Sequence, residues 1–186
     1  MATDVITLIT ADHRKVEALF ERLKNGKGDP AVTVSDTVSE LHALLTAHAR
    51  AEEDRVYPGI DAHHGVEEHK EAEVLLDALV RARPGTSEFR EALHRLADAV
   101  SHHVEEEENE LLPELARRAG PEKLQELGKA FRQRRDEELR ALTTAQDPYT
   151  SATKAKLYEQ AQKADIPGRS QMDKEELERA LQQSAS

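Results

Sequence analysis

The sequence has no cysteine, no tryptophan and only 3% aromatic residues. Without cysteine the chain cannot form disulfides, thiolate-bound zinc sites or iron–sulfur clusters. Imidazole and carboxylate groups then remain as the strong metal ligands. The scarcity of aromatic residues, together with abundant Leu, Ala and Glu, favours a helical protein over a β-sandwich or a β-barrel.

Basic charge and long apolar runs are also scarce. The chain has 26 Lys and Arg against 37 Asp and Glu, which gives a formal net charge of −11. Such an acidic chain is a poor non-specific ligand for nucleic acid or anionic membranes, because phosphate contacts need clustered Lys and Arg. No segment approaches the roughly 20 apolar residues of a membrane span, and the start MATDVITLIT lacks the basic region of a signal peptide. We therefore expect a cytoplasmic protein with no membrane partner.

Apolar residues recur at helical spacing in four segments. The four expected helices cover about residues 3–24, 35–57 and 66–83, and a stretch from 87 to at least 111. Breaker residues such as Pro84 and Gly85 separate them, Thr86 or Ser87 can cap the fourth helix, and the stretch 61–65 is expected to form a turn. Four amphipathic helices joined by short loops predict an all-α, up-down-up-down four-helix bundle.

Two further parts are expected after the bundle. A fifth helix, over residues 121–142, is expected to pack against the side or end of the bundle. Asp147-Pro148 then interrupts the pattern, and the remainder predicts a helix, a loop and a helix, with Asp173 and Glu176 spaced as in a capping box. We expect residues 1–146 to form the bundle domain and residues 147–186 to form a linker and a small helix–loop–helix.

One pattern occurs twice, as HARAEEDRVYP from His48 and as HVEEEENELLP from His103. Each copy contains His-x-x-x-Glu-Glu, then four residues, then proline. Residues four apart lie on one face of a helix, so each histidine can share a target with Glu52 or Glu107 respectively. Both pairs continue the apolar stripe of their helix and are therefore expected to point towards the bundle axis.

The other two helices each contribute one histidine on the buried side. His13 lies between Ile9 and Val16 at helical spacing, and His69 precedes Ala72 in the same way. Burying four imidazoles and two carboxylates without partners would be costly, whereas a bound metal converts that cost into binding energy. Six mixed nitrogen and oxygen ligands are too many for one tetrahedral zinc ion. They suit two ions bridged by the glutamates, and iron fits, with manganese or zinc as substitutes.

Neighbouring residues compete for these roles. His102 and Glu106 form a rival pair, but the phase of the apolar stripe favours His103 and Glu107. Glu73, four residues after His69, is a candidate seventh ligand.

The remaining candidates are assigned by their position on the helices. Glu53, Glu106 and Glu108 are expected on a solvated face or as partners of the ligands, and Tyr57 can reach the site from the end of its helix. The other histidines are expected at the surface: His42, His63, His64 and His94.

With these motifs, residues 3–142 resemble the hemerythrin-like HHE cation-binding domains. The resemblance rests on DHRKV around His13, HARAEEDRVYP, EEHKEAEVLL around His69, and HHVEEEENELLP. It implies a four-helix bundle with a non-haem di-iron centre, in which two glutamates bridge the ions. The implied ligands are His13, His48, Glu52, His69, His103 and Glu107, with Glu52 and Glu107 as the bridges.

The ligand set differs from that of oxygen-carrying hemerythrins, which have a second histidine where this chain has Glu73. This difference disfavours reversible oxygen carriage. The resemblance implies a protein that decomposes hydrogen peroxide in a catalase-like reaction. The alternative is a non-enzymatic module that binds or senses iron, oxygen or nitric oxide. A structural zinc bundle is a third interpretation, although six ligands exceed what that role needs.

The C-terminal LYEQAQKADIPGRSQMDKEELERAL resembles the small helix–loop–helix units of the SAP-like and Rho N-terminal type, some of which bind nucleic acid. Residues 147–186 carry six Lys or Arg and seven Asp or Glu, and Arg169 is the single arginine of the loop. This balance disfavours strong phosphate binding. Docking to a protein, or a simple capping role, fits the segment at least as well.

Overall fold

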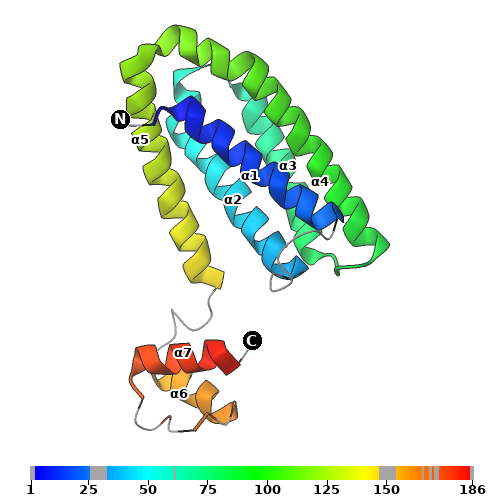
Figure 1. Ribbon diagram of the computed structural model, residues 1–186, viewed down its shortest axis with the longest axis vertical. Helices are drawn as coiled ribbons and strands as arrows, with labels where there is room; N and C mark the ends of the chain where they lie inside the picture. Colours follow the sequence, from blue (N-terminus) through cyan, green and yellow to red (C-terminus); the bar gives the residue numbers. More distant parts are fainter. Residues whose placement is uncertain are drawn as a thin grey trace. The chain divides into compact units, whose positions relative to one another are not determined.

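The computed structural model describes residues 3–25, 33–60, 62–146, 154–164, 166, 167, 169 and 172–184, and these residues form helices and no strand. The first four helices are α1 (Val5–Asn25), α2 (Val34–Arg55), α3 (His63–Arg81) and α4 (Ser87–Glu106). They lie side by side (Figure 1), with α1 against α2 and α4, and α3 against the same two helices. This closed arrangement confirms the expected all-α bundle.

Capping side chains set the starts of two of these helices. In α2 the backbone N–H of Asp36 donates to the Thr33 hydroxyl at 3.1 Å, and the N–H of Thr33 donates to the Asp36 carboxylate at 2.9 Å. Thr86 caps α4 by accepting a hydrogen bond from the N–H of Phe89. Such caps satisfy N–H groups that the first helical turn leaves unpaired. Of the two residues considered for α4, Thr86 is therefore the cap.

The prediction of a turn at 61–65 is wrong for the residues of this stretch that the structure describes. Asp61 lies outside the described residues. Helix α3 begins at His63, so His64 and Gly65 are helical. The reversal is made earlier by a short 3-10 helix, η1 (Tyr57–Gly59). A Cβ atom on Gly65 would lie 2.9 Å from the Tyr57 hydroxyl oxygen. Glycine at this position therefore allows the tyrosine to pack against the start of α3.

The fourth helix extends beyond Leu111, in line with the expectation that it reaches at least that residue. It continues through one π-helical turn, η2 (Glu107–Leu111), into α5 (Leu112–Gln146). Gly120, with φ of 68°, interrupts α5 immediately before Pro121. Glycine tolerates a positive φ, and proline fits the first turn of the helical segment that follows. The chain reverses there and runs back along the bundle (Figure 1), so the expected fifth helix begins at Pro121 as predicted.

Two apolar clusters flank a buried polar layer. The first includes Val16, Leu19, Phe20, Val38, Leu41, Leu79, Phe89, Leu93 and Leu96. The second includes Val5, Ile9, Ala51, Val56, Tyr57, Leu112, Leu115 and Phe131. In α1 the buried residues Asp12 and His13 fall between Ile9 and Val16, so the polar layer separates the clusters. Burying each Leu or Phe contributes roughly 1.5–3 kcal/mol, which offsets the cost of that layer.

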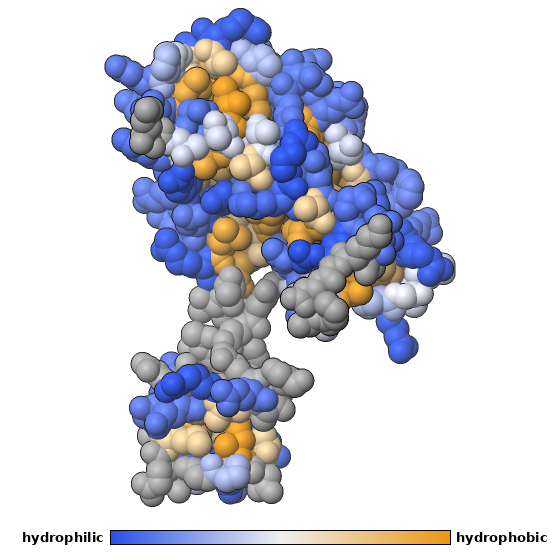
Figure 2. Space-filling view, viewed as in Figure 1, coloured by the Kyte–Doolittle hydropathy of each residue, from blue (hydrophilic) through white to orange (hydrophobic). Residues whose placement is uncertain are grey.

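The outer surface of the bundle is polar. Figure 2 shows hydrophilic side chains over most of the visible face of the bundle. None of the helices in the described parts of the chain is long and apolar enough to cross a membrane.

The chain divides into two compact units, Met1–Leu139 and Arg140–Ser186. The second contains α6 (Lys154–Lys163) and α7 (Lys174–Ser184). Its small core consists of Leu157, Ala161, Ile166, Leu177 and Leu181. The expected helix–loop–helix is thus confirmed, whereas the assignment of 1–146 and 147–186 to separate domains stays a prediction.

The capping box predicted for the last helix is present. The N–H of Asp173 donates to the Glu176 carboxylate at 2.8 Å, and the N–H of Glu176 donates to the Asp173 carboxylate at 2.9 Å. This reciprocal pair fixes the start of α7.

Gly128 allows α5 to pass close to the start of α1. A Cβ atom there would lie 2.5 Å from the carbonyl oxygen of Thr3. We expect Gly128→Ala to lower the free energy of unfolding by about 1–3 kcal/mol through overpacking, despite the gain of about 1 kcal/mol in helix propensity. Urea denaturation measures the change.

The matched control is Gly59→Ala, because a Cβ atom on Gly59 meets nothing within 4 Å. It should leave the free energy of unfolding nearly unchanged. Equal stabilities for the two variants would contradict the close packing of α5 on α1.

Candidate metal centre

The six side chains predicted as ligands come together in the polar layer. All six are buried: His13 from α1, His48 and Glu52 from α2, His69 from α3, His103 from α4 and Glu107 from η2. Their ligand atoms form two groups that share Glu52. The groups are His13, His48, Glu52 and Glu107, and Glu52, His69 and His103. The fold therefore assembles the predicted set, and each group can hold a metal ion.

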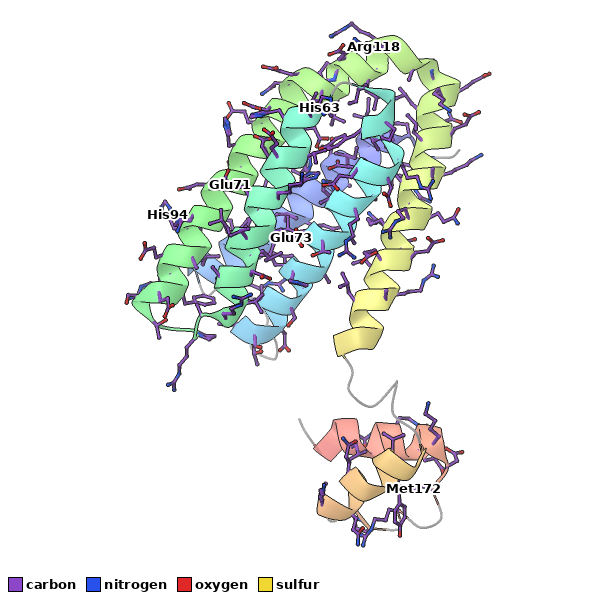
Figure 3. All side chains as sticks on the ribbon, turned by 180° about the vertical axis from the view of Figure 1, so that it is seen from behind. His63, Glu71, Glu73, His94, Arg118 and Met172 are labelled. Carbon is purple, nitrogen blue, oxygen red and sulfur yellow. The ribbon has the colours of Figure 1, made fainter. Side chains whose placement is uncertain are left out.

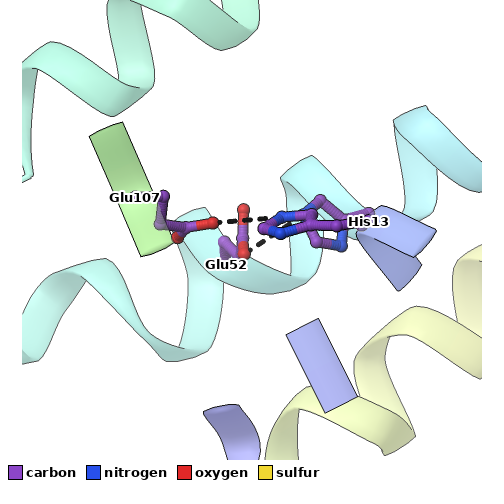
Figure 4. A group of neighbouring side chains, drawn as sticks. His13, Glu52 and Glu107 are labelled. Carbon is purple, nitrogen blue, oxygen red and sulfur yellow. Dashed lines mark ion pairs between the residues drawn. The ribbon is translucent and has the colours of Figure 1, made fainter. Parts of the chain in front are cut away.

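The first group contains four polar atoms with unmet hydrogen-bonding capacity. His13 Nε2 lies 3.2 Å from Glu107 Oε2, and His48 Nε2 lies 3.2 Å from Glu52 Oε1. Figure 4 shows the Glu107 carboxylate facing His13, with Glu52 beside it. These four atoms are buried and have no hydrogen-bond partner. An unsatisfied buried polar group costs about 1–3 kcal/mol, so the donor set fits a cation that all four atoms would bind.

The second group also has the spacing of a shared ion. His69 Nε2 lies 3.2 Å from His103 Nε2 and 3.3 Å from Glu52 Oε2. Two imidazole nitrogens that are each about 2.1 Å from one ion, at adjacent positions, lie about 3 Å apart. The observed separation of the two nitrogens agrees with that geometry.

The two glutamates connect the histidine pairs. Glu52 directs Oε1 to His48 and Oε2 to His69, so its two oxygens face different groups. Glu107 Oε2 lies 3.2 Å from His13 and 3.9 Å from His103. Each carboxylate therefore faces one histidine of each pair, which is the arrangement a bridging ligand needs.

The π-helical turn positions the second of these glutamates. Glu107 is the first residue of η2, and such turns inside α-helices are frequent at functional sites. Glu107 lies at Nε2 of His13, while the next residue, Glu108, lies 2.8 Å from its Nδ1. The wider turn thus places two consecutive carboxylates against opposite ring nitrogens of one histidine.

Every histidine of the cluster has a carboxylate at its other ring nitrogen. The Nδ1–carboxylate pairs are His13–Glu108 at 2.8 Å, His48–Asp12 at 3.6 Å, His69–Glu53 at 3.0 Å and His103–Glu68 at 2.8 Å. A carboxylate only accepts hydrogen bonds, so at the hydrogen-bonded His13, His69 and His103 it favours the tautomer with the proton on Nδ1. The Nε2 lone pair then remains available to a metal ion.

These partners were only partly foreseen from the sequence. Glu53 and Glu108, considered as solvated residues or partners of the ligands, are both partners. Asp12 and Glu68 were missed. Asp12 is fully buried in α1, and its place beside His13 was a usable signal. Glu68 gave no signal, because its partner His103 lies in another helix.

Helix α5 supports the cluster from outside the four-helix bundle. Arg135 donates to both carboxylate oxygens of Asp12 at 2.7 Å, and Phe131 packs edge-on against His48 with ring centroids 5.9 Å apart. Burial alone would raise the pKa of Asp12, but His48 and Arg135 outweigh it and lower that pKa. Asp12 therefore remains ionised beside its histidine.

The cluster holds protons in the metal-free chain. Burial would lower the pKa of His48, but the carboxylates of Glu52 and Asp12 outweigh it and raise the pKa to about 10. Burial likewise opposes protonation of His69, yet Glu52 and Glu53 raise its pKa. Against the effect of burial, His48 and His69 hold the pKa of Glu52 well below its usual range.

Tyr57 reaches the cluster. Its hydroxyl lies 3.4 Å from Glu52 Oε2, His69 Nε2 and Glu107 Oε1. Burial, together with the two carboxylates, raises its pKa, so the hydroxyl keeps its proton. Tyr57 is therefore a hydroxyl donor inside the site.

The other competitors lie outside the two groups. Glu73 is exposed and belongs to neither group (Figure 3). His102 and Glu106 point away from the buried layer, with side chains 65% and 36% exposed. The phase of the apolar stripe thus predicted which of the two pairs is buried, and the assignment of His103 and Glu107 as ligands stays a prediction.

A pocket gives access to the cluster from the surface. Its lining combines His48, His69 and His103 with apolar Val16, Leu45, Ala72, Leu76 and Val100, and with charged Arg50, Lys70 and Glu73. A small molecule can therefore reach the histidines along a largely apolar wall.

Comparison with known proteins agrees with this site. A family model described as the hemerythrin HHE cation binding domain matches residues 4–115. A DNA nickase from Nostoc sp. (strain PCC 7120 / SAG 25.82 / UTEX 2576) is 30% identical over 132 residues, which cover 67% of this chain. The match spans only 37% of that relative's length. No solved structure matches the chain. With its matching domain model and its buried His/Glu cluster, the chain belongs to the hemerythrin HHE cation-binding domain family.

Proposed function

We propose that the buried cluster is a non-haem, carboxylate-bridged centre for two iron ions. The observation that carries the proposal is the division of Glu52 between two histidine groups, with one oxygen facing each. Imidazole and carboxylate ligands suit iron, manganese and zinc, and membership of the hemerythrin family supports iron. His13 and His48 would bind one ion, His69 and His103 the other, and Glu52 and Glu107 would bridge them.

We further propose that the centre reacts with a small oxygen species, hydrogen peroxide first. When bound, two adjacent iron ions supply reversible oxidation and reduction. The pocket would admit the small ligand, and its apolar wall would limit the access of bulk water. The hydroxyl oxygen of Tyr57 lies 3.4 Å from an oxygen of each proposed bridging glutamate, and its proton can be donated in a hydrogen bond there. Decomposition of two peroxide molecules to two waters and one O₂ balances without an external reductant.

The alternative is a binding module that senses iron, oxygen or nitric oxide without turnover. The same buried ligand set and pocket would serve it. Turnover separates them, since an enzyme consumes many equivalents of peroxide per chain and a sensor binds a stoichiometric amount.

Metal content tests the centre. We expect about two tightly bound iron ions per purified full-length chain by elemental analysis, after a chelating resin has removed loosely held metal. His103→Ala removes a ligand of the second group and should lower both the iron content and the peroxide turnover, with helicity retained.

The control is His94→Ala, because His94 is an exposed histidine of the same helix, paired only with Asp98 among the ion pairs of the described residues. It should keep the iron content and the turnover of the native chain. Tightly bound zinc, no metal, or full peroxide turnover in His103→Ala would overturn the redox proposal.

Proton release gives a second test. Metal binding requires a neutral imidazole, so loading must displace the proton of His48, whose pKa is about 10 in the metal-free fold. At pH 7.5 we expect at least about one proton released per chain, seen by calorimetry as a dependence of the binding enthalpy on the buffer's ionisation enthalpy. The release should diminish above about pH 10. Binding without any proton release at pH 7.5 would contradict the assignment of His48 as a ligand.

The same pKa affects the stability of the metal-free fold. His48 has a raised pKa in the folded state, so its stabilising contribution is fully present below its ordinary value of 6.5. That contribution is lost as the pH rises through about 10.

A DNA-directed role is the second candidate, favoured by the relative named as a DNA nickase. The net charge of −11 opposes phosphate binding, as does the balance of charges in residues 147–186, the segment proposed as a nucleic-acid or protein contact. Incubation of the metal-loaded chain with supercoiled plasmid should leave the plasmid supercoiled. Conversion to open circles by the native chain, but not by His103→Ala, would instead favour the DNA-directed role.

A further inference from the structure

A second His/Glu cluster lies at the surface, where α3 meets α4. His64 and Glu68 are four residues apart in α3, and His102 and Glu106 are four residues apart in α4. Each pair therefore lies on one helical face. His64, Glu68 and Glu106 each offer a ligand atom within 4.8 Å of the others, and His102 contacts both glutamates. We call these four residues the outer cluster.

Two of the four imidazole–carboxylate distances in the outer cluster are close to those of a four-coordinate ion, and the other two are longer. Glu106 lies 3.5 Å from His64 Nε2 and 3.2 Å from His102 Nε2. Glu68 Oε1 lies 3.8 Å and 4.0 Å from the same two nitrogens. Ligand atoms bound to a tetrahedral ion at about 2.0–2.2 Å are separated by about 3.3–3.6 Å. His64, Glu68 and Glu106 are therefore close enough to share one ion, and a rotation of the exposed His102 side chain would add a fourth ligand.

A second, independent observation is that one carboxylate oxygen of Glu68 is buried without a hydrogen-bond partner. Its Oε2 accepts from His103 Nδ1 at 2.8 Å, whereas its Oε1 is buried and has no hydrogen-bond partner. The imidazole nitrogens of His64 and His102 lie 3.8 Å and 4.0 Å from Oε1, too far for hydrogen bonds. A buried carboxylate oxygen normally has a partner. A cation between the two pairs would provide it.

The charges and ligand types define the kind of ion. Within the described parts of the chain, the ion pairs of Glu68 and Glu106 are all with histidines, so their two negative charges have no Lys or Arg partner there. Two carboxylates match the charge of a divalent cation. Two imidazoles favour a transition metal over magnesium or calcium. The side chains of His64 and His102 are 68% and 65% exposed, so an ion can reach them from solvent.

We propose that His64, Glu68, His102 and Glu106 form a surface site for one divalent transition-metal ion, separate from the buried centre. Glu68 joins the two, because one of its oxygens faces the outer cluster and the other holds His103. The site would give a role to the second pair of His-x-x-x-Glu motifs in these helices.

Helix α4 also contains an ordinary surface ion pair, which can be compared with the outer cluster. His94 Nδ1 lies 2.8 Å from Asp98, also four residues apart, and both side chains are exposed. This pair belongs to none of the His/Glu groups that could hold a metal in the described parts of the chain. Figure 3 shows His94 well away from His63, which marks the start of α3 and the neighbourhood of the outer cluster.

Zinc uptake tests the proposal. The full-length chain is treated with chelating resin, its tightly bound metal is measured, and it is dialysed to equilibrium against micromolar Zn²⁺. The native chain and His94→Ala should take up about one more zinc ion per chain than the double variant His64→Ala/His102→Ala. The amount of tightly bound metal per chain should be the same in the native chain and in both variants. Because it is measured before zinc is added, this amount tests the dinuclear centre separately from the outer site. Equal zinc uptake by the native chain and the double variant would overturn the outer site.

A conservative variant provides a second test of the outer site. Glu106→Gln preserves the size of the side chain and removes one charged ligand, so it should weaken zinc binding at the outer site at least tenfold, with unchanged helicity and tightly bound metal. Visible absorption of Co²⁺ in place of zinc gives the second readout. The native chain should show the intense bands of four-coordinate cobalt, and Glu106→Gln should not. Identical cobalt spectra would reject the coordination set.

Discussion

The burial of four imidazoles and two carboxylates in one layer of the bundle is the constraint on which the rest of the structure depends. The layer lies between two apolar clusters. Burial of their side chains stabilises the fold and offsets the free-energy cost of burying polar groups in the layer. In the metal-free chain the cluster is partly satisfied by protons, as the raised pKa values of His48 and His69 indicate. Four ligand atoms of the first group still lack partners. The fold therefore holds the six proposed ligands close together.

The surroundings of the layer explain how this arrangement is kept. A carboxylate stands at Nδ1 of every histidine, which directs the Nε2 lone pairs inwards. Helix α5 extends this support, because Arg135 fixes Asp12 and Phe131 packs against His48. The fifth helix is thus part of the site as well as of the core. Glu68 extends the network to the surface, where we propose the outer ion.

Periodicity predicted much of the structure from the sequence. The apolar stripes predicted that His13, His48, His69 and His103 face the interior of the bundle. Glu52 and Glu107 followed because each lies four residues after a histidine, on the same helical face. The cap at Thr86 and the break before Pro121 followed from local backbone chemistry. Other features depend on departures from the regular helix or on contacts between helices. The π-turn at Glu107 changes the helical phase, and Arg135 meets Asp12 across 123 residues. A search restricted to single-helix spacing misses both.

Anomalous diffraction at the iron absorption edge, from crystals of the purified full-length chain, tests the central claim most directly. Two bridged ions predict two separate iron peaks, one beside Nε2 of His13 and His48 and one beside Nε2 of His69 and His103, with Glu52 between them. A single peak, or no iron peak within the buried layer, would contradict the account.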